Sequence, residues 1–143
     1  MHGGSLPCRF MIKSRWVGVP VWLVLAPFTA CAPRYDYKAQ CWADGLAALP
    51  RGGDRLHVLA GDFNATLDHP PMRALLGAGY RDAADVTGRG LTPTWPQQGW
   101  EPVPGVTLDH VLADSAMAVG AFGVYALPGT DHRPVFAELT LPR

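Results

Sequence analysis

The chain has 143 residues, which suits one domain with a sizeable core, because a chain of this size buries roughly 68–70 % of its unfolded surface. Its 12 basic residues equal its 12 acidic residues, so the net charge with neutral histidine is zero. That balance excludes an overall basic field that would hold nucleic acid by counterion release, and leaves only a local patch open. Fourteen prolines and sixteen glycines indicate a loop-rich protein without long helices.

The three cysteines, Cys8, Cys31 and Cys41, all lie in the first third of the chain. Their spacing matches no metal-binding pattern. An odd number cannot be fully paired within one chain, so we do not expect a disulfide scaffold.

Residues 1–32 form an atypical N-terminal segment, with basic but no acidic side chains up to residue 16 and no charge from 17 to 32. A positive start before an apolar run is typical of a signal peptide or an anchor. Pro20 and Pro27 argue against a spanning helix, which needs about 20 uninterrupted apolar residues. The alternation from Val17 to Leu25 fits one or two buried strands equally well, and an irregular tail is a third interpretation. Localisation is therefore open between the cytoplasm and a membrane or extracellular site.

The next elements along the chain are a helix, a strand and a second helix. Apolar side chains recur at helical intervals over residues 35–49, which predicts an amphipathic helix covering one face of a sheet. Residues 56–62 form a short apolar run that predicts a buried strand. A second helix is predicted to follow Asp68, a candidate cap, with prolines in its first turn and an end near Gly77.

Residues 80–105 are predicted to be loop. Loops on a rigid scaffold commonly carry recognition, so Trp95 and Trp100 either line the rim of a cleft or pack in the interior. Two further strands are predicted at residues 119–127 and 135–139, on either side of a polar turn.

Residues 106–112 predict a strand that places an acidic side chain among apolar ones. Leu108, His110 and Leu112 would share one face, and Asp109 would lie on the other. A charged side chain in an apolar strand is unfavourable unless it is paired. Asp109 therefore needs a partner from elsewhere in the chain.

Three polar clusters are associated with predicted strands: Gly61-Asp62-Phe63-Asn64, Leu108-Asp109-His110, and Thr130-Asp131-His132-Arg133-Pro134. Each cluster alone is weak, because turns use these residue types anyway. Together, in this order, they resemble the C-terminal half of the endonuclease/exonuclease/phosphatase superfamily. That group includes pancreatic-type deoxyribonucleases, abasic-site endonucleases, inositol polyphosphate 5-phosphatases and neutral sphingomyelinases.

The resemblance covers residues 33–143 and implies an α/β fold. It would have a mixed, mainly antiparallel sheet with packed helices, like one half of a four-layer α/β sandwich. It also implies hydrolysis of phosphodiesters or phosphomonoesters with Mg²⁺ or Mn²⁺. The substrate, nucleic acid or phospholipid headgroup, is undecided.

The resemblance implies a role for each site residue. Asp62 would position or deprotonate the attacking water, and Asn64 would hydrogen-bond a phosphate oxygen. His132 would contact the scissile phosphate, and Asp109 would hydrogen-bond His132. Asp131 would lie at or near the metal ion, with Asp62 as a second ligand.

These roles suit the chemistry, because phosphoryl transfer gains most from positioning and from stabilising charge on the phosphate oxygens. Each residue also has a plainer structural alternative: His132 and Asp131 as turn residues. We expect Arg133 to brace the turn and His110 to pack against the sheet.

The sequence departs from the superfamily in its length and its first residues. Members generally run near twice this length, and their N-terminal half supplies an asparagine and a glutamate that is the main metal ligand. Residues 1–33 contain no Asp, Glu or Asn, so any ion would be weakly bound. We also expect the second sheet to be missing, which would expose a large apolar face.

Three interpretations of the whole chain follow. It is a truncated phosphoesterase, alone or with a missing N-terminal half or another subunit as partner. Alternatively, it is an inactive remnant that docks through its uncovered sheet face. A third interpretation is a membrane-attached member held by residues 17–32.

Overall fold

The computed structural model describes residues 11–14, 21–25, 43–49, 55–98, 102 and 104–142. The named elements are β1 (Met11–Ser14), β2 (Val21–Leu25), β3 (Leu56–Asp62), α2 (Pro70–Gly77), β4 (Tyr80–Asp82), α3 (Ala83–Val86), β5 (Asp109–Asp114), β6 (Ala118–Val124) and β7 (Val135–Thr140).

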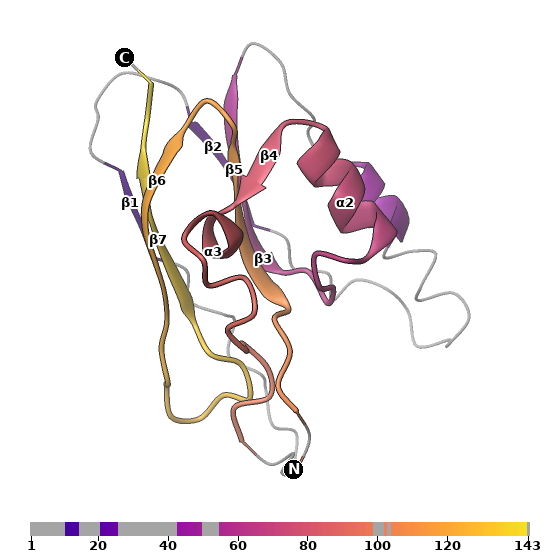
Figure 1. Cartoon of the computed structure of the whole chain (residues 1–143), viewed down its shortest axis with the longest axis vertical. Coiled ribbons are helices and arrows are strands. Elements are labelled where there is room, and N and C mark those ends of the chain that lie inside the picture. Colours follow the sequence, from indigo (N-terminus) through magenta and orange to yellow (C-terminus); the bar gives the residue numbers. More distant parts are fainter. Residues whose placement is uncertain are drawn as a thin grey trace.

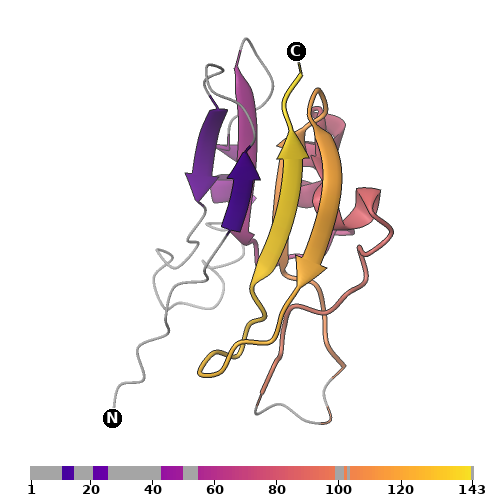
Figure 2. The ribbon, with the colours of Figure 1, turned by 90° about the vertical axis from the view of Figure 1, so that its left-hand side faces the viewer.

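The strands form two sheets. The first has the order β1-β7-β6, with β1 parallel and β6 antiparallel to β7. The second has the order β2-β3-β5-β4, with β2 parallel to β3 and the other pairs antiparallel. Figure 1 shows the sheets packed as two layers with α2 outside the second, and Figure 2 shows β1, β7 and β6 side by side. The predicted mixed, mainly antiparallel α/β fold is confirmed.

A core of apolar side chains fills the space between the two sheets. The alternation of side chains along a strand sends every second residue into this layer. Its buried members are Val58, Ala60, Ala83, Ala84, Val111, Ala113, Met117, Phe122, Val135, Ala137, Leu139 and Leu141. The expectation that a second sheet is missing was therefore wrong, because β7 and β6 cover the inner face of β3 and β5.

A second core lies on the other face of β3 and β5, under the helices. Its buried members are Leu46, Leu59, Phe63, Ala65, Met72, Leu75, Tyr80 and Leu112. Residues 43–47 are helical and contribute Leu46, so this end of the predicted helix 35–49 covers the sheet as expected. Residues 35–42 lie outside the described part.

Helix α2 forms where the prolines predicted it, with proline in its first turn. Its N-cap residue is His69, not Asp68, and the His69 ring makes no cap hydrogen bond to the helix. The ring instead accepts the Thr66 N–H at 3.1 Å, so it fixes the chain just before the helix.

Two boundaries differ from the sequence prediction. Residues 80–86, predicted as loop, form β4 and α3. Both elements are too short to show a period, and Asp82 caps α3 by accepting the Asp85 N–H at 2.8 Å. Strand β5 begins at Asp109, not at residue 106, because the preceding residues bond to residues 90–95 instead.

The N-terminal segment contributes strands to both sheets. Residues 21–25 form the strand β2. Val17, the cysteines and Trp100 lie outside the described residues. The division of the chain into a segment 1–32 and a domain 33–143 stays a prediction. Among the described residues, every helix is too short or too polar to cross a membrane.

Candidate active site

Two carboxylates stand opposite each other where β3 ends and β5 begins. Asp62 and Asp109 are directly paired in the antiparallel register of these strands. Asp62 is two residues from Ala60 in β3, and Asp109 is two residues from Val111 in β5, so each aspartate lies on the same face of the sheet as that apolar residue. Since Ala60 and Val111 face the core between the sheets, both carboxylates project toward the sheet that contains β7.

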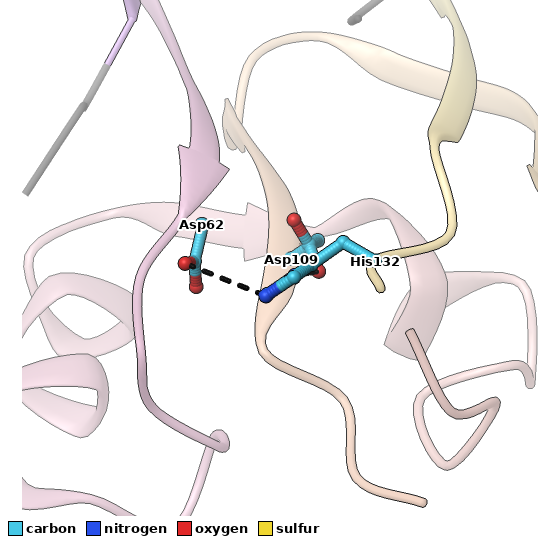
Figure 3. A group of neighbouring side chains, drawn as sticks. All are labelled: Asp62, Asp109 and His132. Carbon is cyan, nitrogen blue, oxygen red and sulfur yellow. Dashed lines mark hydrogen bonds and ion pairs between the residues drawn. The ribbon is translucent and has the colours of Figure 1, made fainter. Parts of the chain in front are cut away.

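His132 approaches them from the connection between β6 and β7. Its Nδ1 donates to Asp109 Oδ2 at 2.8 Å, and its Nε2 lies 3.9 Å from Asp62 Oδ2 (Figure 3). The Asp109 side chain is 2 % exposed, His132 17 % and Asp62 29 %. The partner that the burial of Asp109 requires is therefore His132, and Nε2 and Asp62 stay open to solvent.

The electrostatics of the group favour a protonated ring. The hydrogen bond to Asp109 is the main cause that raises the pKa of His132 above its ordinary value. The charges of Asp109, Asp62 and Asp131 add to the rise, and burial opposes it. Burial raises the pKa of Asp62, with the Asn64 N–H as the main opposing contact. The site thus places a ring that keeps its proton more readily than a free histidine beside a carboxylate that is more basic than usual.

Asn64 lies beside Asp62 in the turn that follows β3. Its backbone N–H donates to Asp62 Oδ1 at 2.8 Å, and its side-chain Nδ2 donates to Oδ2 at 3.2 Å. Asn64 has a φ of 49°, a left-handed conformation that asparagine tolerates better than most residues. The turn therefore orients the Asp62 carboxylate through both of its oxygens.

Asp131 lies outside the group of three. Its Oδ2 accepts the Trp95 indole N–H at 3.3 Å, and the Trp95 ring lies 6.4 Å from the His132 ring. Trp95 thus stands at the side of the site. Arg133 donates to Pro93 O and Pro96 O at 3.3 and 3.1 Å, so the prediction that it braces the turn is confirmed.

Two sets of contacts were missed in the sequence. His110, expected simply to pack, contacts Asp82 Oδ2 through Nδ1 at 2.9 Å and Ala65 O through Nε2 at 2.8 Å. A polar side chain in a buried strand needs a hydrogen-bond partner, so the position of His110 in the apolar run 106–112 was the signal for these contacts. Gln97 holds the β6–β7 connection through Leu127 O and Thr130 O; no sequence period marks it.

The donor set suits a divalent ion held by few protein ligands. Asp62, Asp109 and His132 each offer one ligand atom, all within 4.8 Å of one another. Because Asp109 and His132 are hydrogen-bonded to each other, Asp62 is the carboxylate best placed for an ion. Mg²⁺ accepts one or two carboxylates and keeps several waters, so these residues fit a weakly held ion.

The fold and the site together define a class: a two-sheet α/β protein with a histidine and two carboxylates at facing strand ends. A family model described as the endonuclease/exonuclease/phosphatase family matches residues 1–132. The chain belongs to this family. No curated protein matches the sequence.

The chain is similar to solved structures of several proteins, and three of them differ in identity and in the share of each chain that is covered. An endonuclease/exonuclease/phosphatase from Beutenbergia cavernae is 22 % identical, with a TM-score of 0.55, 78 % of this chain covered and 34 % of that one. A humanized D. rerio TDP2 with 14 mutations is 17 % identical, with a TM-score of 0.55 and coverage of 82 % and 54 %. The mannosyl-6-phosphatase Bt3783 of Bacteroides thetaiotaomicron is 20 % identical, with a TM-score of 0.49 and coverage of 70 % and 46 %. The chain spans about a third to a half of these proteins.

Proposed function

We propose that the chain is the catalytic part of a metal-dependent phosphoesterase that cleaves a phosphate ester with an activated water. The observation that carries the proposal is the position of His132. Its Nδ1 is bonded to buried Asp109, while its Nε2 lies 3.9 Å from Asp62 Oδ2. A ring held in this way presents its Nε2–H to a ligand that lies beside both the ring and the Asp62 carboxylate.

Each side chain then has a separate task. His132, kept protonated by Asp109, donates from Nε2 to a phosphate oxygen and stabilises the charge that grows there in the transition state. Asp62, whose carboxylate is oriented by Asn64, accepts a proton from the attacking water. A divalent ion at Asp62 would supply charge neutralisation at the phosphate. We propose Mg²⁺ or Mn²⁺ as that ion, with Asp131 near it.

The substrate class follows from the site as far as the phosphate ester. The family whose model matches the chain is described by endonuclease, exonuclease and phosphatase activities. We therefore propose a nucleic-acid phosphodiester or a small phosphomonoester as substrate, with a phospholipid headgroup as a further candidate.

The test is hydrolysis by the full chain. Bis(4-nitrophenyl) phosphate and 4-nitrophenyl phosphate would report diester and monoester cleavage, each with Mg²⁺, Mn²⁺ and EDTA. We expect ion-dependent turnover that His132→Gln and Asp62→Asn abolish. His69→Gln is the matched control, because His69 is exposed and lies outside the group of three. Turnover that survives His132→Gln would contradict the proposal.

The same assay decides the docking alternative. That interpretation depended on an uncovered sheet face, and in the described residues the inner faces of β3 and β5 pack on β6 and β7. If pure, folded protein hydrolyses neither ester with any ion, this chain is not an enzyme by itself. Activity that then returns on adding a polypeptide with the family's N-terminal half would assign the missing ligands to that partner.

A further inference from the structure

We infer that Thr94 is a positioning residue that holds Asp109 and His132 in register across the two sheets. Its kinetic consequence rests on the proposed function, but its structural consequence does not. The pair needs such a support because Asp109 begins a strand of one sheet, and His132 lies in the connection between two strands of the other. Sheet hydrogen bonds therefore do not fix their separation.

The side chain of Thr94 holds the Asp109 end. Its Oγ1 accepts the Leu108 N–H at 2.9 Å and the Asp109 N–H at 3.0 Å. Thr94 is fully buried, so water does not compete for these bonds. Two consecutive backbone donors on one oxygen fix both the position and the direction of the chain where β5 begins.

The backbone of Thr94 holds the His132 end. Its carbonyl oxygen accepts the N–H of Arg133, the residue after His132, at 2.7 Å. Its own N–H donates to Val106 O at 3.0 Å, which ties the same residue to the chain that leads into β5. One buried residue thus bonds directly to both segments of the chain that supply the Asp109–His132 contact.

Neighbouring contacts reinforce the connection without duplicating it. Gln97 N–H donates to Asp131 O at 2.6 Å, and its side chain bonds to the same connection. These bonds reach the His132 side alone. Trp95 also bonds to both segments, through Val106 and through Asp131 Oδ2. Thr94 differs from it in accepting the N–H of Asp109 itself and the N–H of Arg133, the residue after His132.

The variant Thr94→Val tests the inference, because it keeps the shape of the side chain and removes the acceptor oxygen. Thr107→Val is the matched control. Thr107 is also buried, and its Oγ1 donates to Gly90 O and Thr92 O at 3.2 and 2.9 Å, but it contacts neither Asp109 nor Arg133 in those bonds. Thr94→Ser, which keeps the hydroxyl, is the rescue.

The first readout is the NMR signal of the hydrogen-bonded Nδ1 proton of His132 in the metal-free chain. We expect Thr94→Val to lose or broaden it, while Thr107→Val and Thr94→Ser retain it. The second readout is kinetic: kcat should fall about 10- to 100-fold with KM unchanged, because a 1 Å misplacement costs about 100-fold. An unchanged proton signal, or an equal loss in Thr107→Val, would overturn the inference.

Two outcomes keep the proposals separable. If the wild-type chain is inactive, the proposed function fails and the NMR comparison alone decides the role of Thr94. If Thr94→Val does not fold, hydrogen exchange in the wild type decides it. The Leu108, Asp109 and Arg133 amides should then show protection within about 10-fold of one another, as in one cooperative unit. An unprotected member of this group would overturn the inference.

Discussion

The molecule contains two histidine–aspartate pairs with nearly the same contact and different surroundings. His110 Nδ1 lies 2.9 Å from Asp82 Oδ2, and His132 Nδ1 lies 2.8 Å from Asp109 Oδ2. The first pair is completely buried, and its other ring nitrogen bonds to Ala65 O. In the second pair the other nitrogen faces solvent and Asp62. What distinguishes a structural pair from a candidate catalytic one is therefore the second nitrogen.

The largest expected effect is on stability, and it separates the two aspartates. Asp82→Asn should lower the free energy of unfolding by about 3–5 kcal/mol, because it removes one partner of a pair that is completely buried. Asp109→Asn should cost less, because the His132 ring reaches solvent and can release its proton. Urea denaturation of both variants measures the difference. Equal losses in the free energy of unfolding would mean that the two pairs contribute equally to stability.

Activity should reverse this order. His132→Gln should lower kcat about 100- to 1,000-fold, the cost of removing one donor to transition-state charge, with Asp109→Asn close behind. Asp82→Asn, assayed at a temperature where it stays folded, should retain most of the wild-type kcat. If all three variants lose activity to the same degree, kcat does not distinguish the His132–Asp109 pair from the His110–Asp82 pair.

The pH dependence of stability should identify His132 as well. Because its pKa is raised above the ordinary 6.5, its contribution is fully present below pH 6.5 and is lost as the pH rises through the folded-state pKa. We expect wild type to exceed His132→Gln by no more than about 1 kcal/mol, with the gap closing at higher pH. Urea denaturation at a series of pH values in EDTA would check the direction.

Asp62 should show the opposite sign. Its pKa is raised above 3.8, mainly by burial, so ionisation destabilises the folded state once the pH exceeds that value. Asp62→Asn in EDTA should therefore be more stable than wild type at neutral pH, by a margin that shrinks as the pH falls toward 3.8. Thermal unfolding at several pH values would measure the margin, and a destabilised variant at neutral pH would contradict it.

The smallest expected effect is that of the ion alone. At an ion concentration equal to its Kd, Mg²⁺ or Mn²⁺ should raise the Tm by about 1–3 °C. Asp62→Asn should remove the increase, whereas His69→Gln should leave it. An equal increase in Asp62→Asn would place the ion elsewhere.

The sequence predicted the strands and the pairing of Asp109 because those features have local causes. A short apolar run marks β3, and a carboxylate in an apolar strand demands a partner. The second sheet was missed because strand partners are non-local: the sequence of β7 does not show that it pairs with β1. Thr94 and Asp82 were missed for a related reason, since backbone bonds and very short elements leave no periodic pattern.

The origin of the site in two layers has a consequence for residues far from it. Asp62 and Asp109 belong to one sheet, and His132 lies in the connection between two strands of the other, so a small slip between layers would open the 2.8 Å contact without unfolding either. Val111 and Val135 are buried between the sheets, so changes in their volume would alter the spacing of the proposed catalytic groups. Adding or removing one methyl group between the sheets would therefore be expected to change the distance between Asp109 and His132.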